Sequence, residues 1–131
     1  MLLKYPQVIL WLAGHEHRHH VEWIGDAEGD VGLWQVETAS HIDWPQQSRT
    51  VEVVRDDLGD IYIGLTVVDH AAPATYNEAK SPLEMAALAR LLCAIFGKRE
   101  KNLERHILLN GRKEEATSRN VVLRIPKREI K

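Results

Sequence analysis

The sequence predicts an α+β fold that is mostly antiparallel β, with one main helix towards the C-terminus. Short β-branched or alternating runs dominate the first 70 residues, turn-forming residues separate them, and one long stretch has helical spacing. The 131 residues are enough for one domain with a real core, taken here as 1–131. Within it, 1–70 forms the β-rich part and 71–131 holds the helix and a basic tail.

The first 47 residues contain two predicted strands. Residues 7–13 are apolar and stop at Gly14, which is typical of a short buried strand. Residues 33–38 alternate apolar and polar side chains, as a half-buried strand does. The acidic, glycine-rich stretch 21–32 predicts a loop or hairpin turn, and 39–47 predicts an ordered loop around a proline.

A hairpin is predicted next. Two β-branched runs, 50–55 and 61–68, flank the Asp- and Gly-rich residues 56–60. Residues 120–125 are predicted to form a last strand, closed by Pro126. Residues 98–119 are charged and irregular, with a short helix expected around 103–108.

The main helix has several agreeing start signals. Ser81 can cap it, Pro82 suits its first turn, and Glu84 completes a capping box. Apolar residues then recur at helical spacing up to residue 96, and Gly97 is a suitable C-terminal cap.

Four of the seven histidines lie within residues 15–20, directly after the first predicted strand. In an extended backbone His15 and His17 would share a face, roughly 6.6 Å apart. Such a pair can share one metal ion or hold one ion each of a pair about 3.5–4 Å apart. A solvated His-rich loop is the alternative, and His19 and His20 are expected at the surface.

Charge is distributed unevenly along the chain. Residues 1–70 hold 4 basic and 12 acidic residues, whereas 71–131 hold 13 basic and 7 acidic ones. The acidic part suits a cation, and the scattered basic residues, without interleaved aromatics, favour no nucleic-acid partner. No apolar run reaches the roughly 18 residues of a membrane span, and no signal-peptide layout is present, so a cytoplasmic location is expected. The single Cys93 excludes an internal disulfide and is expected to be a buried small hydrophobe.

Gly14-His15-Glu16-His17 after an apolar strand resembles the last metal motif, Gly-His-x-His, of calcineurin-like metallophosphoesterases. Residues 38–47 (TASHIDWPQQ) and 68–73 (VDHAAP) are similar to the C-terminal part of a bacterial subgroup of these enzymes, as is Arg119-Asn120-Val121 before the last strand. The resemblance covers most of residues 5–73.

The resemblance implies an α/β/β/α sandwich with two divalent metal ions, Mn, Fe or Zn, at the ends of the sheets. His15 would bind one ion and His17 the other, with Gly14 leaving room for the turn. The implied activity is hydrolysis of a phosphate mono- or diester by a metal-activated water.

Three further residues are site candidates. Asp43 would accept a hydrogen bond from a ligating imidazole and so orient it. His41 would line the substrate pocket as a possible catalytic residue, and His70 is a further pocket candidate. The competing interpretation is structural: Trp44 and Pro45 brace the loop, and its polar residues satisfy the backbone.

The other metal motifs of that family do not occur in this sequence. There is no Asp-x-His, no Gly-Asp-x-x-Asp and no Gly-Asn-His. The resemblance therefore implies the C-terminal portion of a phosphoesterase, inactive alone, which needs the N-terminal half of the enzyme or a second copy of itself. The alternative function is a stand-alone β-rich module that binds a single Zn or Ni ion through its His cluster, without catalysis.

Overall fold

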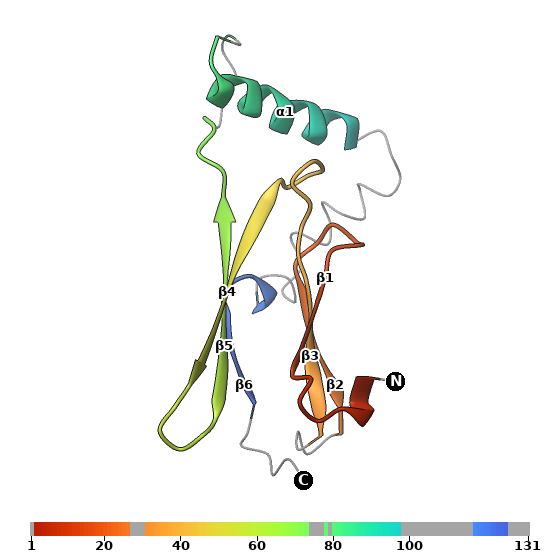
Figure 1. The fold of residues 1–131 in the computed structure, drawn as a ribbon. Helices are drawn as coiled ribbons and strands as arrows, with labels where there is room; N and C mark the ends of the chain where they lie inside the picture. Colours follow the sequence, from red (N-terminus) through yellow and green to blue (C-terminus); the bar gives the residue numbers. More distant parts are fainter. Residues whose placement is uncertain (1, 27–30, 74–77, 79, 98–116, 126–131) are drawn as a thin grey trace.

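The fold consists of two three-stranded sheets and one main helix (Figure 1). A computed structural model describes residues 2–26, 31–73, 78, 80–97 and 117–125. The α+β class with mostly β structure is confirmed. The elements are η1 (Leu2–Lys4), β1 (Leu10–Ala13), β2 (His20–Gly25), β3 (Gly32–Glu37), β4 (Gln47–Arg55), β5 (Ile61–Asp69), α1 (Pro82–Gly97) and β6 (Val121–Ile125).

The first sheet has the strand order β1-β3-β2. β2 and β3 are antiparallel, but β1 runs parallel to β3, with Leu10 beside Trp34 and Leu12 beside Val36. The strand predicted at 7–13 is shorter than expected, because β1 begins only at Leu10.

The prediction of a loop or turn from residue 21 was wrong for its first part, which is β2. In this strand Val21 and Trp23 pack against the core, while Glu22 between them is exposed. This alternation is the signature of a half-buried strand. At its end Gly25 pairs with Gly32, where a Cβ on either residue would lie within 3 Å of backbone and of the Trp23 ring. The absence of side chains at these two glycines therefore allows β2 and β3 to lie close together.

The second sheet has the order β4-β5-β6 and is antiparallel throughout. Its hairpin is confirmed where it was predicted. In the turn, the Asp56 carboxylate accepts hydrogen bonds from the backbone N–H groups of Leu58 (3.0 Å) and Asp60 (2.8 Å), and Gly59 adopts a φ of 93°. The turn is thus closed by an Asp side chain and by a glycine in a conformation that other residues rarely adopt.

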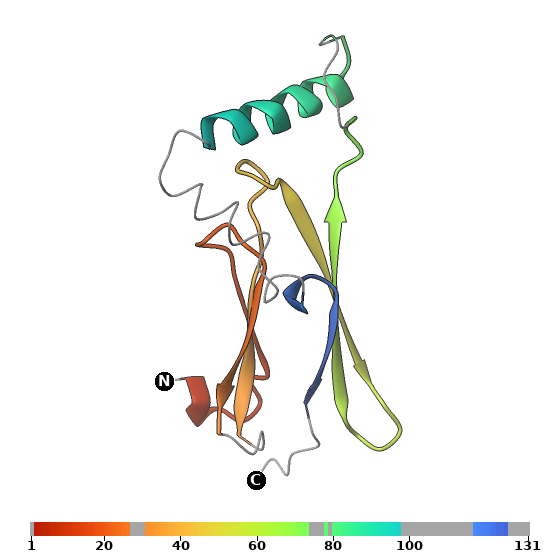
Figure 2. The same cartoon turned by 180° about the vertical axis from the view of Figure 1, so that it is seen from behind.

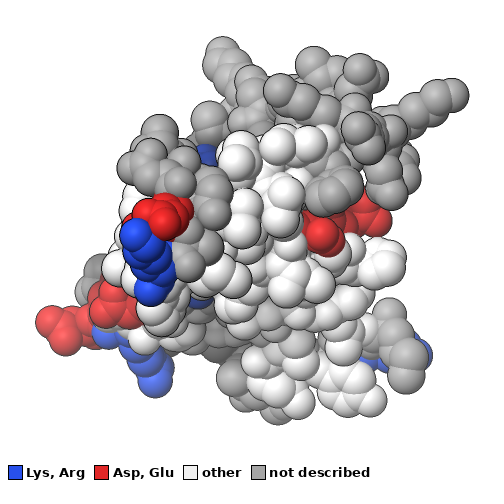
Figure 3. Space-filling model, turned by 90° about the horizontal axis from the view of Figure 1, so that it is seen from above, with Lys and Arg blue, Asp and Glu red and all other residues white. Residues whose placement is uncertain are grey.

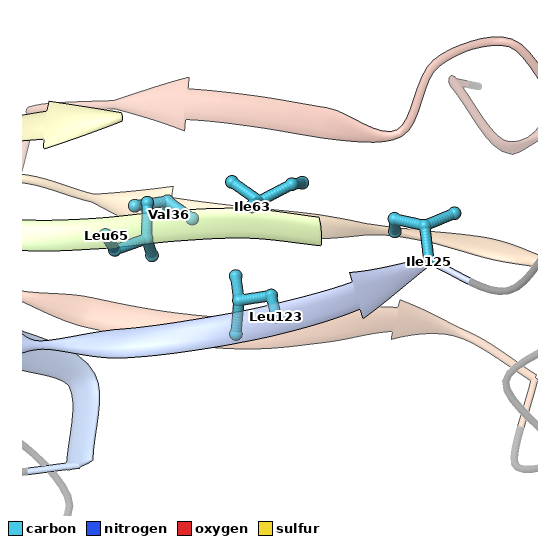
Figure 4. Close-up of a cluster of buried hydrophobic side chains, with 5 residues drawn as sticks. All are labelled: Val36, Ile63, Leu65, Leu123 and Ile125. Atoms are coloured by element: carbon cyan, nitrogen blue, oxygen red, sulfur yellow. The ribbon is translucent and has the colours of Figure 1, made fainter. Parts of the chain in front are cut away.

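The core lies between the two sheets (Figure 4). Its buried members come from β3, β5 and β6: Val36, Ile63, Leu65, Leu123 and Ile125. Cross-strand partners share a face of a sheet, so these buried positions identify the face of β3, β5 and β6 that points inward. The last strand, distant in sequence, completes the core against β5.

The main helix α1 lies across one end of both sheets (Figures 1 and 2). Ser81 caps the helix as predicted, since its Oγ accepts from the backbone N–H of Glu84 at 3.3 Å. The Glu84 carboxylate accepts from the N–H of Lys80 at 3.0 Å, one residue before the N–H that a capping box uses. From the α1 end, uncharged side chains cover the middle of the view and charged ones lie towards its margins (Figure 3). Several apolar residues of α1 are exposed: Leu83, Met85, Leu91, Leu92 and Ile95.

The short helix expected around 103–108 lies outside the described residues. Among the helices that the structure describes, none has both the length and the hydropathy needed to cross a membrane.

Candidate metal centre

The histidine motif occupies the loop that joins β1 to β2, at the α1 end of the sheets. The loop leaves β1 at Ala13, whose carbonyl accepts a hydrogen bond from Thr38 N–H at 2.9 Å. Residues 15–18 form bends, and His17 has a left-handed φ of 53°. The expectation that His15 and His17 share a face of an extended chain was therefore wrong in its premise, since the loop turns between them.

A second loop, 38–46, lies beside the first. Ser40 Oγ accepts hydrogen bonds from the backbone N–H groups of Ile42 (3.1 Å) and Asp43 (3.2 Å). Gln46 N–H donates to the Asp43 carbonyl at 2.8 Å. Gln46 has a φ of 59°, and the Trp44–Pro45 peptide is cis. The ordered loop predicted at 39–47 is confirmed up to residue 46, and Gln47 begins β4.

The two loops meet at one contact between side chains, His17 and Asp43. His17 Nδ1 lies 2.6 Å from Asp43 Oδ2, and both side chains are partly exposed, at 37% and 57%. Because a carboxylate only accepts, Nδ1 must carry the proton, and in the neutral ring Nε2 then presents a lone pair. An imidazole held through one nitrogen by a carboxylate is the usual arrangement of a metal-ligating histidine.

His17 and Gln46 are the non-glycine residues with left-handed φ among those described. They lie on the two loops that His17 and Asp43 bring together. Such backbone conformations cost energy and tend to occur at functional sites, so their position agrees with a functional role for this junction.

His15 is exposed at the tip of the loop, as is Glu16. Arg18 turns back to the sheet, where its Nε donates to the nearly buried Glu37 at 3.0 Å. A Cβ at Gly14 would meet only the Thr38 carbonyl oxygen at 3.9 Å, an ordinary contact. The chain itself therefore does not require glycine at this position.

His19 was expected at the surface, and this was wrong: it is only 1% exposed. Its Nε2 lies 3.1 Å from Gln47 Oε1, across the space between the sheets. Burial, together with the charge of Arg49, lowers the pKa of His19 from 6.5 to about 4. His19 is therefore neutral at physiological pH, and its ring is buried in contact with Gln47.

A basic cluster lies around His19. Arg49 of β4 donates from Nη2 to the Ser118 carbonyl at 2.6 Å, and burial and the charge of Arg119 lower the pKa of Arg49 to about 10. Ser118 Oγ in turn accepts from Val21 N–H at 3.2 Å. Sequence reasoning missed this cluster, although the alternation through Val21 and Trp23 would have placed His19 on the inner face.

The other histidines that the structure describes have local partners. His20 Nε2 lies 3.6 Å from a carboxylate oxygen of Glu22. His41, the possible catalytic residue, is exposed and contacts Ser48 Oγ through Nε2 at 2.9 Å. His70 Nδ1 accepts from Ala72 N–H at 3.2 Å, just beyond β5.

Cys93 is only partly buried, and it bonds to the second loop. Its thiol donates to the Ile42 carbonyl at 3.0 Å and accepts from Gln46 Nε2 at 3.4 Å. Burial, and to a lesser degree the charge of Asp43, raises the pKa of the thiol. The residue therefore acts as a contact between α1 and the loop, in addition to packing.

The donor set of the site is incomplete within the described residues, which bring no three His, Cys, Asp or Glu side chains together as a metal site. The described contacts bring His17 and Asp43 together, and His15 is exposed on the same loop as His17. A dinuclear site needs further oxygen or nitrogen ligands.

No family model, no curated protein and no solved structure matches this chain. The interpretation of the site therefore depends on its own geometry.

Proposed function

We propose that this chain is part of a dinuclear-metal phosphoesterase that hydrolyses phosphate mono- or diesters, and that it contributes His15 and His17 as metal ligands. The observation that carries the proposal is the contact of 2.6 Å between His17 Nδ1 and Asp43 Oδ2. It joins the Gly-His-x-His motif to the second stretch that resembles this enzyme family.

The residues of the chain have separate roles in this proposal. Asp43 fixes the ring and the tautomer of His17, so that Nε2 is available to an ion. His15, exposed at the tip of the loop, is the ligand of the second ion. Bound Mn, Fe or Zn would polarise phosphoryl oxygens and acidify a water molecule. The exposed His41 lies on the same loop as Asp43, where it contacts substrate.

The missing ligands come from a partner in this proposal, either the N-terminal half of the enzyme or a second copy of the chain. Two histidines leave most of the coordination positions of two ions unfilled. Loops at the end of a sheet are suited to such a shared site, because a partner can approach them without disturbing the core.

The alternative, one Zn or Ni ion held by the whole His cluster, is disfavoured by the fold. His19 is buried and contacts Gln47, and His20 lies on β2 beside Glu22. Only His15 and His17 remain on the exposed part of the loop.

Metal content per chain, measured by elemental analysis on untagged protein, tests the proposal. We expect bound Mn or Zn to be lost in a His15→Ala/His17→Ala double variant. Two ions per wild-type chain would mean that the chain completes the site unaided, for example across a dimer. Little or no metal in the wild type would place the remaining ligands on a partner, and the measurement is then repeated with that partner added.

His20→Ala is the matched control, because His20 belongs to the cluster but lies outside the motif. It should leave the metal content unchanged. An equal loss in His20→Ala and in the double variant would favour the single-ion cluster. No metal with the partner present would contradict both functions.

A further inference from the structure

The two glutamines that follow Pro45 have no part in the proposed chemistry, yet both are buried. Gln46 is 9% and Gln47 6% exposed. Gln46 is the last residue of the loop that carries Asp43, and Gln47 is the first residue of β4. Glutamine is mostly exposed in proteins, and a buried amide must find hydrogen-bond partners, so the partners of these two side chains indicate what they hold.

The partners of Gln47 fix the orientation of its amide. Nε2 donates to Asp69 Oδ1 at 2.9 Å, and a carboxylate can only accept. The same Asp69 oxygen accepts from Arg90 of α1 at 3.3 Å. Oε1 of Gln47 therefore faces His19 Nε2 at 3.1 Å.

The orientation of this amide determines the tautomer of His19. An amide oxygen only accepts, so His19 must carry its proton on Nε2. Arg119 also donates to the same oxygen, at 3.5 Å. His19 Nδ1 is buried and has no hydrogen-bond partner among the residues described. The hydrogen bonds from Asp69 through Gln47 to His19 are thus compatible with one orientation of the Gln47 amide and one tautomer of His19.

His19 is the last residue of the histidine loop, because β2 begins at His20. The other end of the loop is held at Ala13 by Thr38 N–H. The loop is thus held at Ala13 and at His19, and between these two points His17 meets Asp43.

Gln46 stabilises the second loop, 38–46. Its backbone N–H donates to the Asp43 carbonyl at 2.8 Å, and its side chain donates to Cys93 of α1 at 3.4 Å. Since Gln46 and Gln47 are neighbours in the chain, the two loops are attached to one dipeptide. This accounts for the burial of both amides.

We propose that Gln47 is a positioning residue for the loop 14–19 between β1 and β2. Its side-chain amide holds His19 and so keeps the loop in the position that brings His17 Nδ1 against Asp43. The contacts carry this inference by themselves. Only its consequence for metal affinity rests on the proposed function.

The test is the tautomer of each histidine in the metal-free protein, measured by long-range 1H–15N NMR near about pH 8, where imidazoles of ordinary pKa are neutral. We expect one tautomer at each of two positions, with the proton on Nδ1 of His17 and on Nε2 of His19. In Gln47→Met, which keeps the length of the side chain without its polar atoms, His17 should show an average of both tautomers.

Gln7→Met is the matched control, because Gln7 is an exposed glutamine that precedes β1. It should leave the His17 signal unchanged. If Gln47→Met does not fold, Gln47→Asn replaces it, since its amide is one methylene too short to reach His19. An unchanged His17 tautomer in a folded Gln47 variant, or a proton on Nδ1 of His19 in the wild type, would overturn the inference.

Zn2+ titration of the same proteins separates this inference from the proposed function. Gln47→Met should weaken zinc binding at least tenfold relative to wild type and to Gln7→Met. If the wild type binds no zinc even with its partner present, while the tautomers behave as expected, the positioning role stands and the proposed function fails.

Discussion

At the residue scale, one hydrogen bond decides which nitrogen of His17 faces outward. Asp43 holds Nδ1 at 2.6 Å, so Nε2 is the nitrogen available to a ligand. His19, two residues later, has the opposite arrangement, with Nε2 bound and the ring buried. The two rings are therefore held through opposite nitrogens, and His17 is partly exposed whereas His19 is buried.

Asp43→Ala should lower metal affinity about 10- to 100-fold, because the His17 ring loses the acceptor that orients it. Isothermal titration with Mn2+ or Zn2+, with any required partner present, measures this. Asp57→Ala, an exposed aspartate in the β4–β5 turn, is the control and should have no effect. Equal affinities in the wild type and Asp43→Ala would contradict the role of Asp43.

The burial of His19 predicts a pH-dependent stability. The unfolded chain protonates His19 below about pH 6.5, but the folded chain does so only below about pH 4. Between these values the unfolded state binds more protons, so the free energy of unfolding falls as the pH decreases from about 6.5 to about 4, by about 3 kcal/mol in all.

Urea unfolding at several pH values checks this linkage. His19→Leu should remove this contribution to the pH slope, whereas His41→Leu, which changes an exposed histidine, should keep it. A His19→Leu variant with the wild-type slope would show that other groups cause the pH dependence.

At the element scale, β5 is the centre of the second sheet, because it pairs with both β4 and β6. It contributes Ile63 and Leu65 to the core, facing Leu123 and Val121 of β6. When a buried side chain is shortened on a strand that is paired on both edges, packing against both neighbouring strands is affected. The stability of the sheet should therefore depend strongly on β5.

Ile63→Ala should lower the free energy of unfolding by about 2–5 kcal/mol, and Ile63→Val by about 0.5–1.5 kcal/mol, because Ile63 is fully buried. Val122→Ala, on the exposed face of β6, should change it by less than about 0.5 kcal/mol. Chemical denaturation measures all three. Equal effects at the two positions would contradict the assignment of inner and outer faces.

At the scale of the whole molecule, the two sheets meet at their inner faces while other apolar surface stays uncovered by the described residues. Trp11 and Leu12 of β1 are 46% and 53% exposed, and they lie on a strand that is paired on one side, with β3. Because successive residues of a strand point to opposite faces, these side chains leave apolar surface on both faces of this edge strand. Such an edge is a place where another chain can pair. It is compatible with a chain that completes its site with a partner.

The chain by itself should therefore hydrolyse a model phosphodiester such as bis(p-nitrophenyl) phosphate no faster than its His17→Ala variant, even with added Mn2+. The reason is that two histidines alone do not hold two ions in place. Turnover by the purified chain that His17→Ala abolishes would show that the site is complete without a partner.

Local signals in the sequence were sufficient to predict the start of α1 and the β4–β5 turn. Ser81, Pro82 and Glu84 mark the start of α1, and Asp56 and Gly59 mark the hairpin turn, because capping and turn formation involve residues only a few positions apart. The sequence also indicated the histidine motif and Asp43 as site candidates, and their chemical role is still a prediction.

Which of these residues come into contact depends on the packing of the two sheets, which local signals do not reveal. β2 was missed because the acidic, glycine-rich composition around residues 25–32 outweighed the alternation of Val21 and Trp23. The burial of His19 and its bond to Gln47 join positions 28 residues apart. Contacts of this kind depend on how two sheets pack, and a local pattern does not encode that packing.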